Sequence, residues 1–425
     1  DAPAGLIASE TLRSEIEGIR QGIDNTSRAN NVINTAEGAL GEASSLLLEL
    51  QSLTNEAANT GALSKQEIEA NQLQVDSILN SINRIANTTQ FNGVKLLNGQ
   101  LDYITSGVAS TAIDTMSINA AKLPEGGYQT VAVQVTGSAQ LAEVTFTGSI
   151  GSAATTVEVA GVDGVEQFSF AANTANSAVA FAINQLKEAT GVSATATSAG
   201  VTMNSTSYGS NSFVSVKTLE GTFANSKDFG VDAEVTINGA KASVDGLTAS
   251  VRSGDMDIEM TLDTAFATTV DPAGTTFEIT GGGAKFQIGS RVNRPGQIHV
   301  GISSVSTSKL GSEIVGFLSS VSSGGDNSLV GGNTIQAQKI ITESIRQVAT
   351  MRGRLGALQK NVLDTNINSL NVALENVTAS ESAIRDADFA AETAGLTRAQ
   401  ILVQANTSVL SQANSSPQNV LSLLG

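Results

Sequence analysis

Few residues in this chain have the chemistry of a catalytic or metal site. The single histidine, His299, lies in the pattern GQIHVGI, and no second histidine or cysteine exists to share a metal with it or to orient it. Asp255, Asp257 and Glu259 alternate along SGDMDIEM and could suggest calcium, but the segment lacks the converging oxygens and the glycine of a calcium loop. We interpret these carboxylates as a solvated strand face.

Two glycine-rich runs, GSIGSAATT and TGGGAKF, lack the spacing with which phosphate-binding loops hold nucleotides. We interpret the first as a turn and the second as a hinge or linker. The absence of cysteine excludes disulfides, thiol catalysis and cysteine-based zinc sites. The sequence therefore predicts a protein that is not an enzyme, with no catalytic residues, no cofactor and no metal.

The composition and the net charge disfavour further classes of function. A length of 425 residues with 40% hydrophobic residues is enough for folded domains, and a formal net charge of −17 disfavours nucleic acid. No apolar run reaches 18 residues and the amino terminus is not that of a signal peptide, so we expect no membrane insertion. The chain starts without Met and in mid-pattern, so we expect a further amino-terminal segment to precede it.

The first part of the chain has the periodicity of one long helix over about residues 6–59. At 1.5 Å per residue it would be on the order of 75 Å long, which predicts a rod. Its apolar seam shifts by one residue between Ile23 and Ile33, which indicates a local change of supercoil or partner. The seam residues are Leu12, Ile16, Ile19, Ile23, Ile33, Ala36, Leu40, Ala43, Leu47 and Leu50.

A second helix is predicted over residues 64–88. Ser64 and Glu67 have the spacing of a capping box, and Val75, Ile78, Leu79, Ile82 and Ile85 form one apolar stripe. The following Asn92-Gly93 dipeptide is typical of a tight β-hairpin turn.

Residues 111–284 are rich in Val, Thr, Gly and Asn and predict a mainly-β region. They contain 18 acidic and 6 basic residues, so most of the negative charge lies here and should face solvent. One helix is expected in TANSAVAFAINQLKEATG, with Gly191 as its C-cap. Its expected buried residues are Val179, Phe181, Ala182, Ile183 and Leu186.

Helical periodicity returns at residues 333–377, at a length that mirrors the first helix. Two long helices at opposite ends of a chain pack most economically antiparallel. The predicted fold class is therefore α+β, a long antiparallel α-helical coiled-coil-like rod built from both chain ends with an inserted mainly-β domain. The seam residues are Ile341, Ile345, Val348, Met351, Leu355, Leu358, Val362, Ile367, Leu370, Leu374 and Val377.

The last 45 residues form a mostly amphipathic helix with no obvious internal cover for its apolar side chains. Two arginines, Arg385 and Arg398, are too few to hold anionic lipid, so helix partners are favoured over a membrane. Other copies of the chain are the expected cover, and head-to-tail contacts of this kind produce filaments. The expected self-assembly residues are Phe389, Leu396, Ile401, Leu402, Val409, Leu410, Val420, Leu421, Leu423 and Leu424.

Four motifs resemble bacterial flagellins: DAPAGLIASETLRSEIEGIRQ, TAEGALGEASSLLLELQSLTNEAANTG, TQFNGVKLLNG and the carboxyl-terminal IRDADFAAETAGLTRAQILVQANTSVLSQANSSPQNVLSLLG. The middle is similar to the Ile-Asn module of flagellins, here Ile183-Asn184. The resemblance implies four parts. They are an amino-terminal rod portion with its β-hairpin (1–110), a variable outer β-rich domain (111–284), a carboxyl-terminal rod portion (285–380) and an inner-tube helix (381–425).

The resemblance also implies a function. A flagellin is the self-assembling structural subunit of the extracellular flagellar filament, exported by the flagellar type III system for swimming motility. Its implied partners are other copies of itself, the flagellar secretion chaperone, which takes the same tail before assembly, and hook-associated and cap proteins.

One stretch departs from the flagellins that activate the vertebrate Toll-like receptor. The family's key arginine falls on Glu49, its following leucine is kept at Leu53, and an acidic position falls on Gln74. Opposite charge at a contact costs binding free energy, so we expect weak receptor recognition.

Two alternatives stay open. The chain could be a hook-filament junction protein, although DFAAETAGLTRAQILVQ favours a flagellin. The middle domain could also act as an adhesin within a filament.

Overall fold

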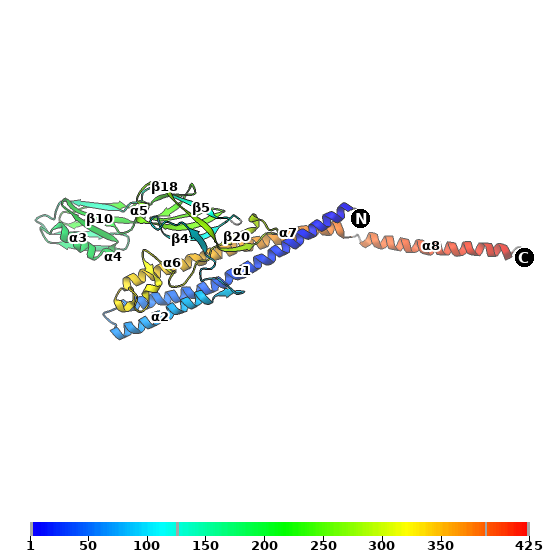
Figure 1. Ribbon diagram of the computed structural model, residues 1–425, viewed down its shortest axis with the longest axis horizontal. Helices are drawn as coiled ribbons and strands as arrows, with labels where there is room; N and C mark the ends of the chain where they lie inside the picture. The colour runs from blue at the N-terminus through cyan, green and yellow to red at the C-terminus, as the bar shows by residue number, and fades with distance from the viewer. Residues whose placement is uncertain (1–2, 125–126, 387–388, 423–425) are drawn as a thin grey trace. The chain divides into compact units, whose positions relative to one another are not determined.

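The computed structural model describes residues 3–124, 127–386 and 389–422. They fall into two compact units. The terminal unit comprises residues 1–27, 287–296 and 363–425, and the central unit comprises residues 28–286 and 297–362. Helices occupy both ends of the described chain and strands occupy its middle, so the predicted α+β fold is confirmed (Figure 1).

The first helix, α1 (Pro3–Ala57), forms as its periodicity predicts. From Ile33 to Leu50 every seam residue is fully buried, including Ala36 and Ala43. The small alanine side chains allow neighbouring helices to approach closely. Where the seam shifts, Thr26 is buried and its hydroxyl donates a hydrogen bond to the Gly22 carbonyl at 2.7 Å.

The second helix, α2 (Lys65–Thr88), starts at the predicted capping box. The Ser64 hydroxyl accepts from the Glu67 amide at 3.3 Å, and the Glu67 carboxylate accepts from the Ser64 amide at 2.7 Å. The two contacts satisfy amide groups that a helix start leaves free. A hairpin of β1 (Gln90–Phe91) and β2 (Val94–Lys95) follows, with positive φ at Asn92 and Gly93 as predicted.

The carboxyl-terminal rod portion is longer than predicted and is interrupted. Helix α6 (Thr334–Leu358) passes into a π-helical turn (Gln359–Leu363) and then into α7 (Asp364–Arg385). The expected end near Val377 was wrong because the polar run after it contains no helix breaker before Asp386. None of the 22 residues of α7, all of them described, is buried.

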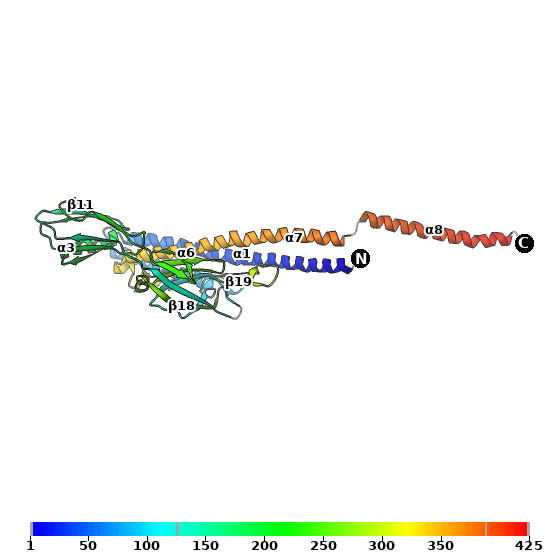
Figure 2. The same ribbon diagram turned by 90° about the horizontal axis from the view of Figure 1, so that it is seen from above.

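Within the terminal unit, α7 lies antiparallel to the first part of α1, as both views show (Figures 1 and 2). The Ser9 hydroxyl donates to the Glu381 carboxylate at 3.1 Å, and Asn366 Nδ2 donates to Thr26 Oγ1 at 3.1 Å. Within the central unit, α6 lies beside the later part of α1, where Arg352 forms a two-atom ion pair with Glu37 at 2.8–3.0 Å.

The strands of the middle region build two hydrophobic cores. The first core lies between the sheets β14-β13-β5-β18-β3 and β15-β16-β17-β4, and the second lies between β6-β10-β9 and β12-β11-β7-β8. Residues 142–216 of the second core are inserted into the sequence of the first. All neighbours in these four sheets are antiparallel.

The strands of the first core are β3 (Tyr103–Ser106), β4 (Ile113–Ala121), β5 (Gln129–Gly137), β13 (Glu234–Ile237), β14 (Ala240–Lys241), β15 (Ser243–Asp245), β16 (Thr248–Arg252), β17 (Met256–Leu262) and β18 (Asp271–Gly282). Those of the second core are β6 (Glu143–Thr147), β7 (Thr155–Ala160), β8 (Val165–Phe170), β9 (Val192–Thr197), β10 (Gly200–Ser205), β11 (Phe213–Glu220) and β12 (Ser226–Phe229).

The remaining elements are short, apart from α8 (Phe389–Ser422) at the carboxyl end. Two small sheets are formed by β19 (Ala284–Gln287) with β20 (Gln297–Val300) and by β21 (Gly311–Ser312) with β22 (Gly316–Phe317). The short helices are α5 (Thr264–Ala267) and 3₁₀ turns at Arg294–Gly296, Leu318–Val321 and Leu329–Gly331.

The expected middle helix is broken into α3 (Asn176–Gln185) and α4 (Lys187–Thr190), with Gly191 in the left-handed conformation as predicted. Its buried face differs from the prediction: Phe181 and Leu186 are exposed, whereas Val179, Ala180 and Ile183 are buried. The reason is that α3 packs mainly on β9 and β10 through Val179, Ala180 and Ile183, and the side of the helix that carries Phe181 faces solvent.

The Ile-Asn pair has a clear structural role. Ile183 is fully buried in the second core. The Asn184 side chain donates to the Ala194 carbonyl at 2.7 Å and accepts from the Ala194 amide at 2.8 Å. Since β9 is the edge of its sheet, Asn184 satisfies backbone groups that an edge strand leaves free.

The TGGGAKF segment is not the linker that its composition suggested. Gly281 and Gly282 belong to β18, which pairs with β3. A Cβ at Gly282 would lie 2.2 Å from the Asp102 carbonyl oxygen, and one at Gly283 would lie 2.7 Å from the Tyr103 ring. Gly282 and Gly283 are therefore required by close packing and not by flexibility.

We expect Asn184→Ala to lower the free energy of unfolding by about 1–3 kcal/mol, because it leaves two backbone groups of β9 without partners. Urea unfolding followed by circular dichroism measures the change. The exposed neighbour variant Gln185→Ala is the control and should change the free energy by less than about 0.5 kcal/mol. Equal stability of the two variants would contradict this role of Asn184.

Candidate assembly surface

Helix α8 exposes every described side chain from Ala390 to Asn414. Among them are the predicted residues Leu396, Ile401, Leu402, Val409 and Leu410, each between 54% and 66% exposed. The side chains of the predicted Phe389, Val420 and Leu421 lie outside the described part of the chain, as do Leu423 and Leu424 altogether.

Five of the six exposed large apolar residues of α8 form two rows with a sevenfold spacing, and Ile401 lies outside them. Leu396, Val403 and Leu410 make one row, and Leu402 and Val409 make the other. Residues repeated every seven positions lie along one face of a helix that pairs with another helix. Val403, 63% exposed, was not among the predicted residues, although its distance of seven from both Leu396 and Leu410 is the signal that identifies it.

The apolar surface of the terminal unit extends beyond α8. Leu6 and Ile7 at the start of α1 are about two-thirds exposed, and Val372 and Ile384 of α7 are also exposed. Sequence reasoning assigned none of these four residues to the surface. Isolated exposed leucines are ordinary, but apolar residues on three helices of one small unit are typical of an interaction surface.

The receptor-related positions lie in the central unit and differ in exposure. Glu49 on α1 and Gln74 on α2 are exposed, whereas Leu53 is buried. A ligand can therefore reach the carboxylate at position 49 and the amide at position 74 without any rearrangement. Leu53 therefore contributes to the packing of α1 and not to its surface.

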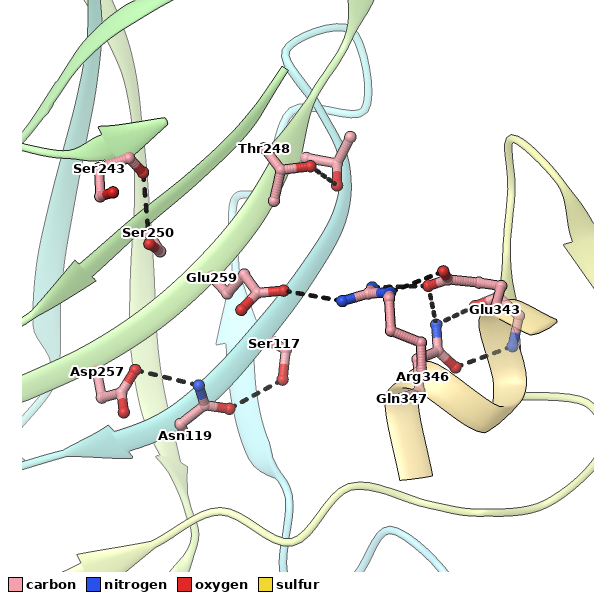
Figure 3. Close-up of polar contacts among 12 residues, drawn as sticks. Ser117, Asn119, Ser243, Thr248, Ser250, Asp257, Glu259, Glu343, Arg346 and Gln347 are labelled. Atoms are coloured by element: carbon pink, nitrogen blue, oxygen red, sulfur yellow. Dashed lines mark hydrogen bonds and ion pairs between the residues drawn. The ribbon is translucent and has the colours of Figure 1, made fainter. Parts of the chain in front are cut away.

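The central unit also contains a polar groove of about 1130 Å³ between the sheet β15-β16-β17-β4 on one side and α6 with the segment 303–317 on the other. Arg346 of α6 binds Glu343 at 2.7 Å, and its Nη1 lies 3.8 Å from Glu259 of β17 (Figure 3). Asn119 donates to Asp257 at 3.1 Å. Of the three carboxylates expected on a solvated face, Asp255 is exposed, whereas Asp257 and Glu259 are each only 27% exposed and have a partner.

Six carboxylates and three cations line this groove, so its formal charge is negative. Hydrogen bonding to Glu343 raises the pKa of Arg346, whereas burial lowers the pKa of Arg354, which also lines the groove. Gln347 of α6 holds the segment 303–317, because its side-chain amide donates to the Gly311 carbonyl at 2.7 Å and accepts from the Gly311 amide at 3.0 Å. Across this groove the sheet contacts α6 through the ion pair between Glu259 and Arg346.

Residues of metal-binding type do not gather in the described ranges, where no group of three such side chains could hold a metal ion. His299 lies half-buried in β20. None of the helices in the ranges given above is both long and apolar enough to cross a membrane.

Comparison with known proteins identifies both ends of the chain. Residues 1–102 match the family model of the bacterial flagellin N-terminal helical region, and residues 338–424 match that of the C-terminal helical region. Flagellin of Salmonella rubislaw is 28% identical over 479 residues, which cover all of this chain and 91% of that protein. Flagellin B of Vibrio cholerae is 28% identical over 425 residues, which cover all of this chain and 89% of that protein.

Among solved structures, flagellar hook associated protein-3 of Legionella pneumophila shares 14% identity. The match covers 89% of this chain and 99% of that one, with a TM-score of 0.34, which is too low to support an argument from fold. The two family models and the full-length relatives agree. The chain belongs to the bacterial flagellin family.

Proposed function

We propose that the apolar rows of α8 join copies of this flagellin into the filament. As a flagellin, the chain is a structural subunit of the extracellular bacterial flagellar filament. The observation that carries the proposal is that α8 exposes apolar side chains at a sevenfold spacing along its described length. Burying each such Leu or Val stabilises an assembly by roughly 1.5–3 kcal/mol.

The proposal also assigns each part of the chain a position in the filament. Residues 1–110 and 285–380 form the rod core of the filament, residues 381–425 form its inner tube, and residues 111–284 face outward. The acidic character of residues 111–284 supports this arrangement, because a net charge of −12 favours contact with water.

The exposed apolar side chains of α8 must also be covered before the subunit assembles. We assign this role to a flagellar secretion chaperone that binds the α8 rows, and we assign export to the flagellar type III system. Hook-associated and cap proteins would meet the chain at the two ends of the filament. The support is physical: an exposed apolar helix of this length promotes uncontrolled association unless it is covered.

A catalytic role is no part of the proposed function. The sequence supports this, because one histidine and no cysteine leave no histidine or cysteine pair for a zinc site and no catalytic thiol. The chain acts mechanically, through the stiffness of its packed helices.

Recognition by the vertebrate Toll-like receptor is proposed to be weak. Glu49 presents an exposed carboxylate where activating flagellins carry an arginine, and Gln74 presents a neutral amide where they carry an acid. A receptor surface that complements the activating charges would meet a like charge at position 49.

We expect Val403→Glu with Leu410→Glu to abolish seeded filament growth, because assembly would bury two unpaired charges in an apolar contact. Sedimentation of filaments grown from purified full chain measures the effect. Thr397→Glu with Gln404→Glu places the same charges seven residues apart but outside both apolar rows of α8, and should leave growth within about twofold. Loss of growth in both double variants, or in neither, would contradict the assignment.

We expect Glu49→Arg to increase receptor signalling at least about tenfold, because it removes a like-charge contact. A reporter-cell assay measures the potency of soluble chain. Glu42→Arg, an exposed position two turns earlier on α1, is the control and should change potency little. A wild-type chain as potent as a standard enteric flagellin would overturn the proposal.

A further inference from the structure

Asparagine followed by glycine is prone to lose its side-chain amide spontaneously, and the chain contains three such pairs: Asn92-Gly93, Asn98-Gly99 and Asn238-Gly239. In this reaction the backbone nitrogen of the glycine attacks the side-chain carbonyl carbon of the asparagine. Glycine has no side chain that would hinder the attack. Which pair reacts in the folded protein therefore depends on how each asparagine side chain is held.

Two of the three pairs form closely similar turns. Asn92-Gly93 joins β1 to β2, and Asn238-Gly239 joins β13 to β14, each as a two-residue connection between antiparallel strands. The φ angle is +50° at both asparagines, +86° at Gly93 and +77° at Gly239. All four residues are exposed, and a Cβ at either glycine would meet no described atom within 4 Å. Exposure, backbone φ angles and crowding therefore do not distinguish the two turns.

The side chain of Asn238 is held by a neighbouring strand. Its Oδ1 accepts from the Ala132 amide of β5 at 2.9 Å, and its own backbone amide donates to the Ala132 carbonyl at 2.9 Å. Its Nδ2 lies 4.0 Å from the Met256 sulfur. Rotation of the Asn238 side chain toward Gly239 would break the bond from Ala132 and leave that amide without its partner, which costs free energy.

The side chain of Asn92 has no such restraint. It forms no hydrogen bond with any residue in the described ranges. The β1-β2 hairpin is a sheet of two strands, whereas β13 lies beside β5 in a sheet of five. The carbonyl carbon of Asn92 can therefore rotate toward the Gly93 nitrogen without the loss of a hydrogen bond.

We propose that Asn92 is a site of spontaneous deamidation in the folded protein, and that Asn238 is protected in its similar turn by the bond to β5. The Gly93 nitrogen forms a bond to the side-chain carbonyl carbon of Asn92. The bond from that carbon to Nδ2 breaks, and ammonia leaves with the proton that the Gly93 nitrogen loses.

The product of this step is a succinimide, which water opens at either of its two carbonyl carbons. One opening gives aspartate, and the other gives isoaspartate, in which the backbone runs through the β-carbon. The net reaction consumes water and releases ammonia, and it needs neither an oxidant nor a reductant.

Isoaspartate at this position would disrupt the hairpin, because it adds a backbone atom to a turn of two residues. The pairing of β1 with β2 comprises only the pairs Gln90 with Lys95 and Phe91 with Val94, so it cannot absorb a shift in register. Both products also add a carboxylate to a chain whose formal net charge is already −17. Deamidation would thus change both the shape and the charge of this turn.

The first experiment follows both turns in the same folded full chain, incubated at neutral pH. Trypsin cuts after lysine and arginine and places the two asparagines in separate peptides, residues 85–95 and 228–241. Chromatography with mass spectrometry measures the loss of amide and separates aspartate from isoaspartate. We expect deamidation to be at least about tenfold faster in peptide 85–95, because only Asn238 must first break a hydrogen bond. A digest of chain that was not incubated corrects for deamidation during digestion.

The same incubation in concentrated urea is the matched control. Urea unfolds the chain and removes the contact between Asn238 and β5, so the two rates should agree within about threefold. Equal rates in the folded chain would overturn the proposal. A difference of about tenfold that persists in urea would also overturn it, because the local sequence and not the fold would then be the cause.

The variant Asn92→Asp tests the position of the reaction. Aspartate tolerates the positive φ angle of this turn, so the hairpin should form, which circular dichroism of the full chain checks for the fold as a whole. The variant has no amide at position 92, so its peptide 85–95 should gain no carboxylate during the same incubation. A continued gain would place the reaction at Asn87 or Gln90 and contradict the assignment to Asn92.

Discussion

The structure depends on one constraint: long helices at both chain ends carry more apolar surface than the chain itself covers. In α8 the described side chains are exposed and the large apolar ones repeat every seven residues. In α7 no residue is buried, although its seam is apolar. A helix of this kind is stable only when a second helix covers it, so the requirement for other copies follows from the hydrophobic effect.

Where these helices are covered by other segments of the same chain, the contacts contain many small side chains. Alanines of α1 are buried without any exposed surface beside leucines and isoleucines, and glycines at positions 18 and 22 let a loop backbone lie directly on the helix. Close packing of this type resists bending, which is what a mechanical filament requires. The buried Thr26 and its contact with Asn366 add a polar fixed point where the apolar seam shifts.

The middle region is stabilised in a different way from the terminal helices. Its two β cores bury Val, Ile and Phe side chains within the region itself, so it does not require other copies for stability. Its contacts with α6 include two ion pairs, Arg346 with Glu259 and Lys339 with Glu188. Such contacts orient a domain while contributing little net stability, because each charge loses hydration as it gains a partner.

Helix periodicity, the capping box at Ser64 and the hairpin at Asn92-Gly93 could be predicted from the sequence because each depends on residues close together in the chain. The α8 residues were identified for the same reason. Four other features could not be predicted from the sequence. They are the π-helical turn, the exposed Phe181, the closely packed glycines before Lys285, and the partners of Asp257 and Glu259. Each of these depends on which segment, distant in sequence, lies opposite, and only the tertiary structure decides that.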